Sequence, residues 1–253
     1  MTNPVFHVPA PELAAAAPGG TLEVTGPEAR HAVTVRRLRA GEPLDLVDGR
    51  GTRARCMFTA GERDRMTVAV DSVTREPVTA PSLTLVQALA KGDRDLQAVE
   101  SATELGVDRV VAWQAERSIV RLRAERAAKT MAKWEATLAS AAKQSRRAHW
   151  PELAPWVDTV GLAELVRAEP ETLWLVLHES IATPWSTAHA AAWRDRERIA
   201  VVVGPEGGIS DGELAALQEA GARPVRLGTT VMRSSSAGPA ALAALNAVLG
   251  FWD

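Results

Sequence analysis

The chain has 253 residues, 46% of them hydrophobic and 24% charged, and a formal net charge of −2, which is the composition of a globular protein with a buried core. Its single cysteine, Cys56, excludes an internal disulfide and a cysteine-rich zinc site, as expected for a protein of a reducing compartment. No apolar run approaches the roughly 20 residues of a membrane helix, and the chain does not begin with the basic leader and apolar region of a signal peptide. We therefore expect a cytoplasmic protein without a membrane partner.

Residues 1–75 predict a small all-β domain, either a barrel or a sandwich. Apolar and polar residues alternate in short segments, which is the period-2 pattern of half-buried strands. Turn pairs such as Asp48-Gly49 and Ala60-Gly61 separate these segments. We expect strands at 21–26, 43–51, 52–61 and 65–74, one helix at 26–35 and a proline-containing linker at 74–82.

The remainder, residues 76–253, predicts an α/β domain. Residues 83–89 and 109–113 are apolar runs of strand length, and between them residues 92–106 have a helical pattern that ends at Gly106. Strand, helix and strand within about thirty residues indicate a βαβ unit, and the fully apolar strands indicate a parallel sheet covered on both faces. Further strands are expected at 172–180, 198–204 and 224–228, with helices at 122–145, 209–220 and 236–250.

Three of these strands end in unusual loops, at 177–180, 204–210 and 227–238. Ligands of open parallel sheets bind at the carboxyl ends of the strands, and glycines such as those of the second loop let backbone amides approach a ligand closely. Ser210 and Glu213 have the spacing of a capping box, so the second loop leads directly into a helix. One glycine-rich turn alone is equally typical of a plain tight turn, but three such loops together favour a ligand site.

Basic residues gather in the N-terminal domain although the whole chain is almost neutral. His31 lies among arginines that could contact phosphates, and the alternative is a solvated helix face balanced by acids such as Glu28. The five histidines have no metal-ligand spacing, so we expect no metal. The residues of this region that could contact phosphates, and that become RNA-binding candidates with the family resemblance below, are His31, Arg36, Arg37 and Arg39.

Five segments together resemble one protein family. Residues 201–214, "VVVGPEGGISDGEL", and 225–245, "VRLGTTVMRSSSAGPAALAAL", look like the SPOUT methyltransferases, which use S-adenosylmethionine (SAM). More narrowly, "HAVTVRRLRAGE" (31–42), "KGDRDLQAVESATELGVDRVVAWQAERS" (91–118) and "KWEATLASAAKQSRRAHWPEL" (133–153) are similar to segments of the RsmE family of 16S ribosomal RNA uridine-N3 methyltransferases. Their order is that of the family, which makes the combination specific.

The resemblance implies a SPOUT-type, mostly parallel α/β domain with a deep trefoil knot, preceded by an all-β PUA-like barrel that binds RNA. It also implies a homodimer that acts on 16S ribosomal RNA in the 30S subunit. SAM would be bound by three strand-end loops, largely through backbone groups, with His178 and Glu179 beside the cofactor rather than in proton transfer. The implied cofactor-binding residues are Leu177, His178, Glu179, Gly204, Pro205, Glu206, Gly207, Gly208, Leu227, Gly228, Val231, Met232, Arg233 and Ser234.

Methylation of uridine N3 requires that N3 first lose its proton. A cation beside the uracil carbonyl oxygens would stabilise the resulting anion, and we assign this role to Arg233. Glu206 or a water molecule could accept the proton, and the alternative for Glu206 is that it accepts hydrogen bonds from nearby backbone amides. Near the end of the first strand of this domain, Lys91 and Arg94 are further candidates for RNA contact.

Two departures from the family pattern leave other functions open. The family commonly has Glu-Thr-Ala after the arginine at position 233, whereas this chain has Ser234-Ser235-Ser236-Ala237, and Lys143 stands where glutamate is common. The alternatives are a SPOUT methyltransferase that acts on another RNA and an RNA-binding relative without catalytic activity. The motif at 31–42 favours the RsmE assignment over the first alternative.

Overall fold

The computed structural model describes residues 3–122, 124–186 and 193–252, and position 123 of the predicted helix at 122–145 lies outside them. The chain forms two compact units, one of residues Met1–Val78 and Ala142–Trp150, the other of Thr79–Ala141 and Pro151–Asp253. The sequence places a single boundary at 75/76. In the structure the chain enters the second unit after Val78 and returns to the first for nine residues, 142–150, which no local pattern indicates.

The N-terminal unit contains one five-stranded mixed sheet with the strand order β1-β3-β4-β5-β2. Only β1 and β3 are parallel, and all other neighbours are antiparallel. The four strands predicted from alternation are confirmed, whereas β1, with three residues, is too short to show a period. The strands are β1 (Val5–His7), β2 (Thr21–Thr25), β3 (Pro43–Val47), β4 (Thr52–Glu62) and β5 (Arg65–Arg75).

The helix predicted at 26–35 is divided in the structure. A single α-helical turn, α2 (Pro27–Arg30), continues as a π-helical turn, η1 (His31–Val35). Gly26 precedes α2 with a φ of 83°, a conformation that glycine adopts without strain. A second short helix, α1 (Ala10–Leu13), follows β1 and buries Leu13 in the core of this unit.

Segment 142–150 is attached to the N-terminal unit by an arginine-centred network. The Arg53 guanidinium lies 2.8 Å from an oxygen of Asp45 and 2.6 Å from one of Glu76, and it donates to the carbonyl oxygen of Arg146 at 2.8 Å. The Lys143 ammonium group pairs with Glu28 of α2 at 2.7 Å. Lys143 therefore has an ion pair in this chain, where the family commonly has glutamate.

The second unit contains a six-stranded sheet, order β11-β9-β10-β6-β7-β8, in which every neighbouring pair is parallel. The prediction of a parallel sheet with apolar strands is confirmed. Strand β10, late in the chain, lies between β9 and β6, so the loops after β9, β10 and β6 meet at one edge. The strands are β6 (Ser82–Ala88), β7 (Arg109–Gln114), β8 (Glu152–Asp158), β9 (Thr172–Leu177), β10 (Arg198–Val203) and β11 (Arg223–Val225).

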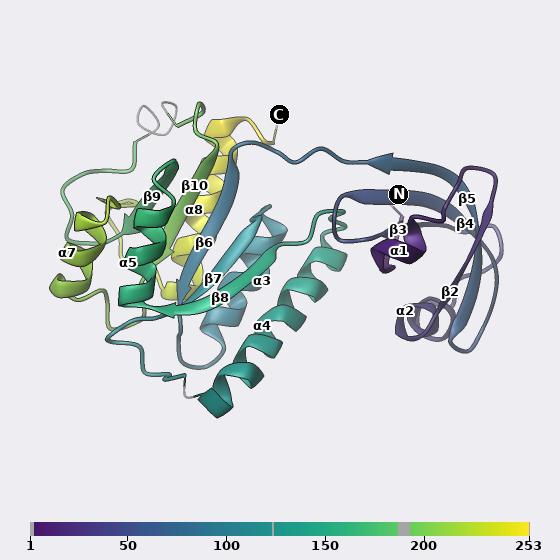
Figure 1. The fold of residues 1–253 in the computed structure, drawn as a ribbon, viewed down its shortest axis with the longest axis horizontal. Helices are drawn as coiled ribbons and strands as arrows, with labels where there is room; N and C mark the ends of the chain where they lie inside the picture. Colours follow the sequence, from purple (N-terminus) through teal and green to yellow (C-terminus); the bar gives the residue numbers. More distant parts are fainter. Residues whose placement is uncertain (1–2, 123, 187–192, 253) are drawn as a thin grey trace. The chain divides into compact units, whose positions relative to one another are not determined.

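Helices cover both faces of this sheet (Figure 1). On one face α3, α4 and α8 pack against alternate strand residues such as Leu85 and Val201, and on the other α5 and α7 pack against the intervening ones, such as Val86 and Val202. Among the described residues no helix is both long and apolar enough to span a bilayer. The helices are α3 (Arg94–Glu104), α4 (Ala124–Gln144), α5 (Thr159–Ala168), α7 (Asp211–Glu219) and α8 (Ser234–Leu249).

Two elements of this unit, β8 and α5, are absent from the sequence-based expectations. Strand β8 lies at the edge of the sheet and contains Pro155, a residue that edge strands tolerate but that obscures a strand pattern. Helix α5 begins at Asp158, whose Oδ1 accepts a hydrogen bond from the Gly161 amide at 2.9 Å. That N-cap is the signal from which the helix could have been predicted.

Candidate cofactor site

A cavity of about 570 Å³ lies at the carboxyl edge of the parallel sheet. Three loops line it, those after β9, β10 and β11, together with Arg94 at the start of α3 and the first turn of α8. Every residue that we predicted to bind the cofactor lies in this lining, from Leu177 in the first loop to Ser234 at the start of α8. A volume of several hundred Å³ with mixed polar and apolar walls is typical of a small-molecule site.

Glycines give the loop after β10 a shape that other residues could not adopt. A Cβ atom on Gly204 would lie 2.6 Å from Cγ1 of Ile209, and one on Gly207 would lie 3.0 Å from Cβ of Arg117. Gly208 has a φ of 74°, in the left-handed region that favours glycine. The loop therefore packs closely against Ile209 and Arg117, where a side chain at position 204 or 207 would not fit.

Glu206 ties this loop to the segment after β6. Its Oε1 lies 3.0 Å from Nη1 of Arg94 and accepts a hydrogen bond from the Lys91 amide at 3.3 Å. Arg94, predicted to contact RNA, thus lines the cavity and forms an ion pair with Glu206. The side chain of Lys91, the other RNA-contact candidate here, is exposed. Of the two roles considered for Glu206, these contacts match that of a hydrogen-bond acceptor for a nearby amide.

Arg233 lines the cavity and is the N-cap of α8. It is exposed, and no acidic side chain of the described residues lies within ion-pair distance of its guanidinium. Beside it Val231 and Met232 are 80% and 38% exposed. An unpaired cation next to exposed apolar side chains suits a flat, polar ring that becomes negatively charged.

The serines that replace the family's Glu-Thr sequence are buried at the start of α8. Ser234 is 7% exposed, and its hydroxyl accepts a hydrogen bond at 2.8 Å from Nε2 of Gln87, the penultimate residue of β6. Gln87 is fully buried, and its Oε1 has no partner among the described residues. Ser235 is 8% exposed. The short hydroxyl side chain of Ser234 thus lines the cavity where a longer acid is common.

One contributor to this edge was not predicted. The segment after β7 brings Arg117 against the loop after β10, where its Nη1 donates to the carbonyl oxygen of Gly207 at 3.2 Å. The signal was present, because residues 115–118 follow an apolar strand in the same way as the three loops that we identified. The sequence analysis did not include it among the loops that follow strands.

The other RNA-binding candidates lie on the N-terminal unit. The His31 ring contacts the edge of Phe6, with centroids 5.7 Å apart, which gives this histidine a structural contact as well. The three arginines that follow it are exposed, and none forms an ion pair with another described residue. Within the described part of the chain no group of three or more metal-ligating side chains occurs. These arginines are Arg36, Arg37 and Arg39.

Comparison with known families agrees with both units. Residues 78–246 match an RNA methyltransferase domain, and residues 24–71 match the PUA domain of RNA methyltransferases. The fold and these matches therefore define an RNA methyltransferase with an N-terminal PUA-like domain. The chain belongs to the family of ribosomal RNA small subunit methyltransferase E, which is the RsmE family that the sequence resembles.

The similarity extends over nearly the whole chain. The ribosomal RNA small subunit methyltransferase E of Mycobacterium tuberculosis is 43% identical over 93% of this chain and 89% of its own length. The Bacillus subtilis protein of the same name is 27% identical over 89% of this chain and 90% of its own length. The crystal structure of the enzyme from Neisseria gonorrhoeae, bound to SAM, superposes with a TM-score of 0.84 at 28% identity and covers 98% of both chains.

The residues present fit SAM as the cofactor. The glycines of the loop after β10 let its backbone pack closely against Ile209 and Arg117, and the described lining of the cavity has mixed polar and apolar residues without a phosphate-binding lysine. Glu179 lies in the same lining and could face the positive charge of a sulfonium or ammonium group. Solved structures of two proteins with the same fold, each 28% identical to this chain, contain bound SAM.

Proposed function

We propose that this chain methylates N3 of a uridine in the 16S ribosomal RNA of the small ribosomal subunit, with SAM as methyl donor. The observation that carries the proposal is the cavity enclosed by three strand-end loops in a chain of this family. When bound, SAM supplies an electrophilic methyl group that a nucleophilic nitrogen can accept. The task of the protein is to align the reacting atoms, which can contribute on the order of 7–11 kcal/mol to lowering a barrier.

Arg233 is the proposed catalytic residue. A uracil ring at the mouth of the cavity carries a proton on N3, and its loss places negative charge on the two carbonyl oxygens. The unpaired guanidinium of Arg233 can hold that charge, while Val231 and Met232 shield the ring from water. Glu206 already accepts hydrogen bonds from Arg94 and Lys91, so we propose that the N3 proton leaves to water and that Glu206 shapes the loop.

The remaining predictions are part of the same proposal. Residues 1–75 would bind ribosomal RNA through His31 and the exposed arginines, and residues 76–253 would select and methylate the base. Phosphate contacts position an RNA, whereas contacts with the base give specificity. The proposal includes a homodimer, a trefoil knot in the second domain and a cytoplasmic location.

The test is transfer of labelled methyl from SAM to 30S subunits that lack the modification. We expect N3-methyluridine, identified by mass, on 30S subunits and little on free ribosomal RNA or transfer RNA. Methylation of transfer RNA instead would support the alternative of a related enzyme with another substrate. Binding of RNA without binding of SAM would support the alternative of a non-catalytic relative.

A further inference from the structure

The Glu213 carboxylate is more deeply buried than a capping box requires. Its Oε2 accepts a hydrogen bond from the Ser210 amide at 3.1 Å, while the Ser210 hydroxyl accepts one from the Glu213 amide at 3.3 Å, so the predicted capping box is confirmed. Glu213 is only 5% exposed, and no cation of the described residues pairs with it. A buried carboxylate without a cation is costly unless several hydrogen bonds satisfy it.

The second carboxylate oxygen of Glu213 accepts further hydrogen bonds from two other segments. Oε1 accepts the Glu116 amide at 2.7 Å and the Thr159 hydroxyl at 2.6 Å. Glu116 follows β7, and Thr159 is the first residue of α5. One carboxylate therefore joins the start of α7 to two neighbouring segments of the sheet edge. We call Glu116, Thr159, Ser210 and Glu213 the Glu213 network.

The network is continuous with the loop that lines the cofactor cavity. Ser210, which ends the loop, donates its hydroxyl hydrogen to Oε2 of Glu116 at 2.6 Å. The next residue, Arg117, donates to the carbonyl oxygen of Gly207 in the middle of the loop. Residues 116 and 117 thus hold two points of a segment that contains three glycines and has little conformational preference of its own.

We propose that Glu213 is a positioning residue for SAM, which holds the loop Gly204–Ser210 in the conformation that lines the cavity. The residue does not line the cavity and acts through Ser210 and Glu116. A flexible loop must be ordered when a ligand binds, and a loop that is already ordered avoids that entropic cost. The inference rests on the proposed function only in that SAM occupies this cavity.

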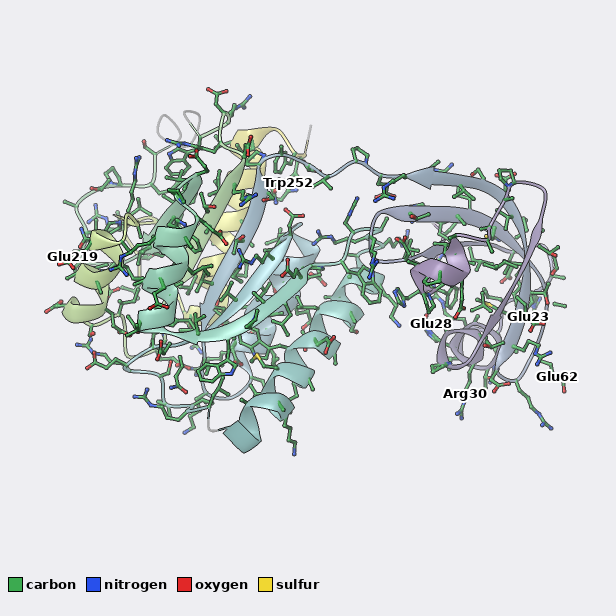
Figure 2. The ribbon with its side chains drawn as sticks, viewed as in Figure 1. Glu23, Glu28, Arg30, Glu62, Glu219 and Trp252 are labelled. Carbon is green, nitrogen blue, oxygen red and sulfur yellow. The ribbon has the colours of Figure 1, made fainter. Side chains whose placement is uncertain are left out.

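The test compares SAM dissociation constants, measured by calorimetry at a temperature where every variant is fully folded. Glu213→Gln replaces an acceptor oxygen with an amide donor that would face donor groups, and hydrogen bonds to charged groups are worth enough to expect a Kd at least about tenfold higher. The control is Glu219→Gln on the same helix, where Glu219 is exposed (Figure 2). The control should bind SAM as the wild type does.

A steady-state measurement separates positioning from catalysis. We expect Glu213→Gln to raise the KM for SAM while kcat at saturating SAM changes by less than about threefold, because bound SAM orders the loop. Equal Kd values for wild type and Glu213→Gln would overturn the inference alone. Failure of the wild type to bind SAM would overturn the proposed function and the inference with it.

A second pair of variants tests the network without changing Glu213. Thr159→Val removes one donor to the carboxylate, and Thr159→Ser keeps the hydroxyl, which also accepts from Nε1 of Trp113 at 3.2 Å. Thr159→Val should bind SAM more weakly than Thr159→Ser. The same affinity for both would contradict the inference even if Glu213→Gln failed to fold.

Discussion

Charged side chains are used differently in the two units. In the N-terminal unit Arg53 has a carboxylate on either side, Asp45 and Glu76, and its side chain is only 13% exposed. At the carboxyl edge of the parallel sheet Arg233 is exposed and has no ion-pair partner among the described residues. A charge whose partners are internal stabilises the fold, whereas a charge left unpaired beside a cavity is available to a ligand. The difference separates structural arginines from functional ones.

Replacing Arg233 should give the largest effect on the reaction. Loss of one charge-stabilising donor from a transition state costs about 100-fold or more in rate, so Arg233→Ala should lower kcat by at least about that factor without lowering the melting temperature. The measurement is single-turnover methyl transfer to 30S subunits. Arg223→Ala, at an exposed arginine in β11, is the control. A native rate for Arg233→Ala would show that the unpaired Arg233 has no role in the reaction.

Replacing Arg53 should lower the stability of the fold and leave the binding of SAM unchanged. Arg53→Ala leaves the buried Asp45 carboxylate without its cation, which should lower the free energy of unfolding by about 3 kcal/mol. Denaturant unfolding measures the loss, and calorimetry should find the Kd for SAM unchanged. A change in SAM affinity with no loss of stability would show that the two roles are not separable in this way.

The glycines of the loop after β10 allow a sharper test of SAM binding within the second unit. Gly204→Ala places a methyl group against the buried Ile209, and we expect the Kd for SAM to rise about tenfold, or about 1.4 kcal/mol. Gly212→Ala is the matched control, because a Cβ there meets nothing within 4 Å and alanine favours the helix. Equal affinities for the two variants would show that the loop tolerates a side chain at position 204 without losing affinity for SAM.

The smallest effect concerns Cys56 in the core of the N-terminal unit. Burial, together with the charges of Asp45 and Asp71, raises the pKa of its thiol to about 12. The unfolded chain loses this proton at lower pH than the folded chain, so stability should fall as the pH rises above about 9. Denaturant unfolding at several pH values should show a shallower decline for Cys56→Ala than for the wild type. Identical slopes would contradict the assigned burial.

Much of this fold could be predicted because its signals are local. The apolar runs of β6 and β10 and the alternation in β4 and β5 are properties of adjacent residues. The same holds for the capping box of Ser210 and Glu213. Strand β1 and helix α5 were missed, since one is too short to show a period and the other follows an edge strand interrupted by Pro155. Segment 142–150 groups with the N-terminal unit through partners such as Glu28, which is more than a hundred residues away, so no local pattern indicates that contact.

The sequence by itself determined that a parallel sheet carries three unusual loops at its strand ends, and the family resemblance implies that these loops bind SAM. Only the tertiary structure decided which charges are already paired there. It joined Arg94 to Glu206, buried Ser234 beside Gln87 and placed Glu213 between Glu116 and Thr159. The physical reason is that a hydrogen bond depends on atoms within about 3 Å of each other. For residues on different strands, the order of the sheet sets that distance, and spacing along the chain does not.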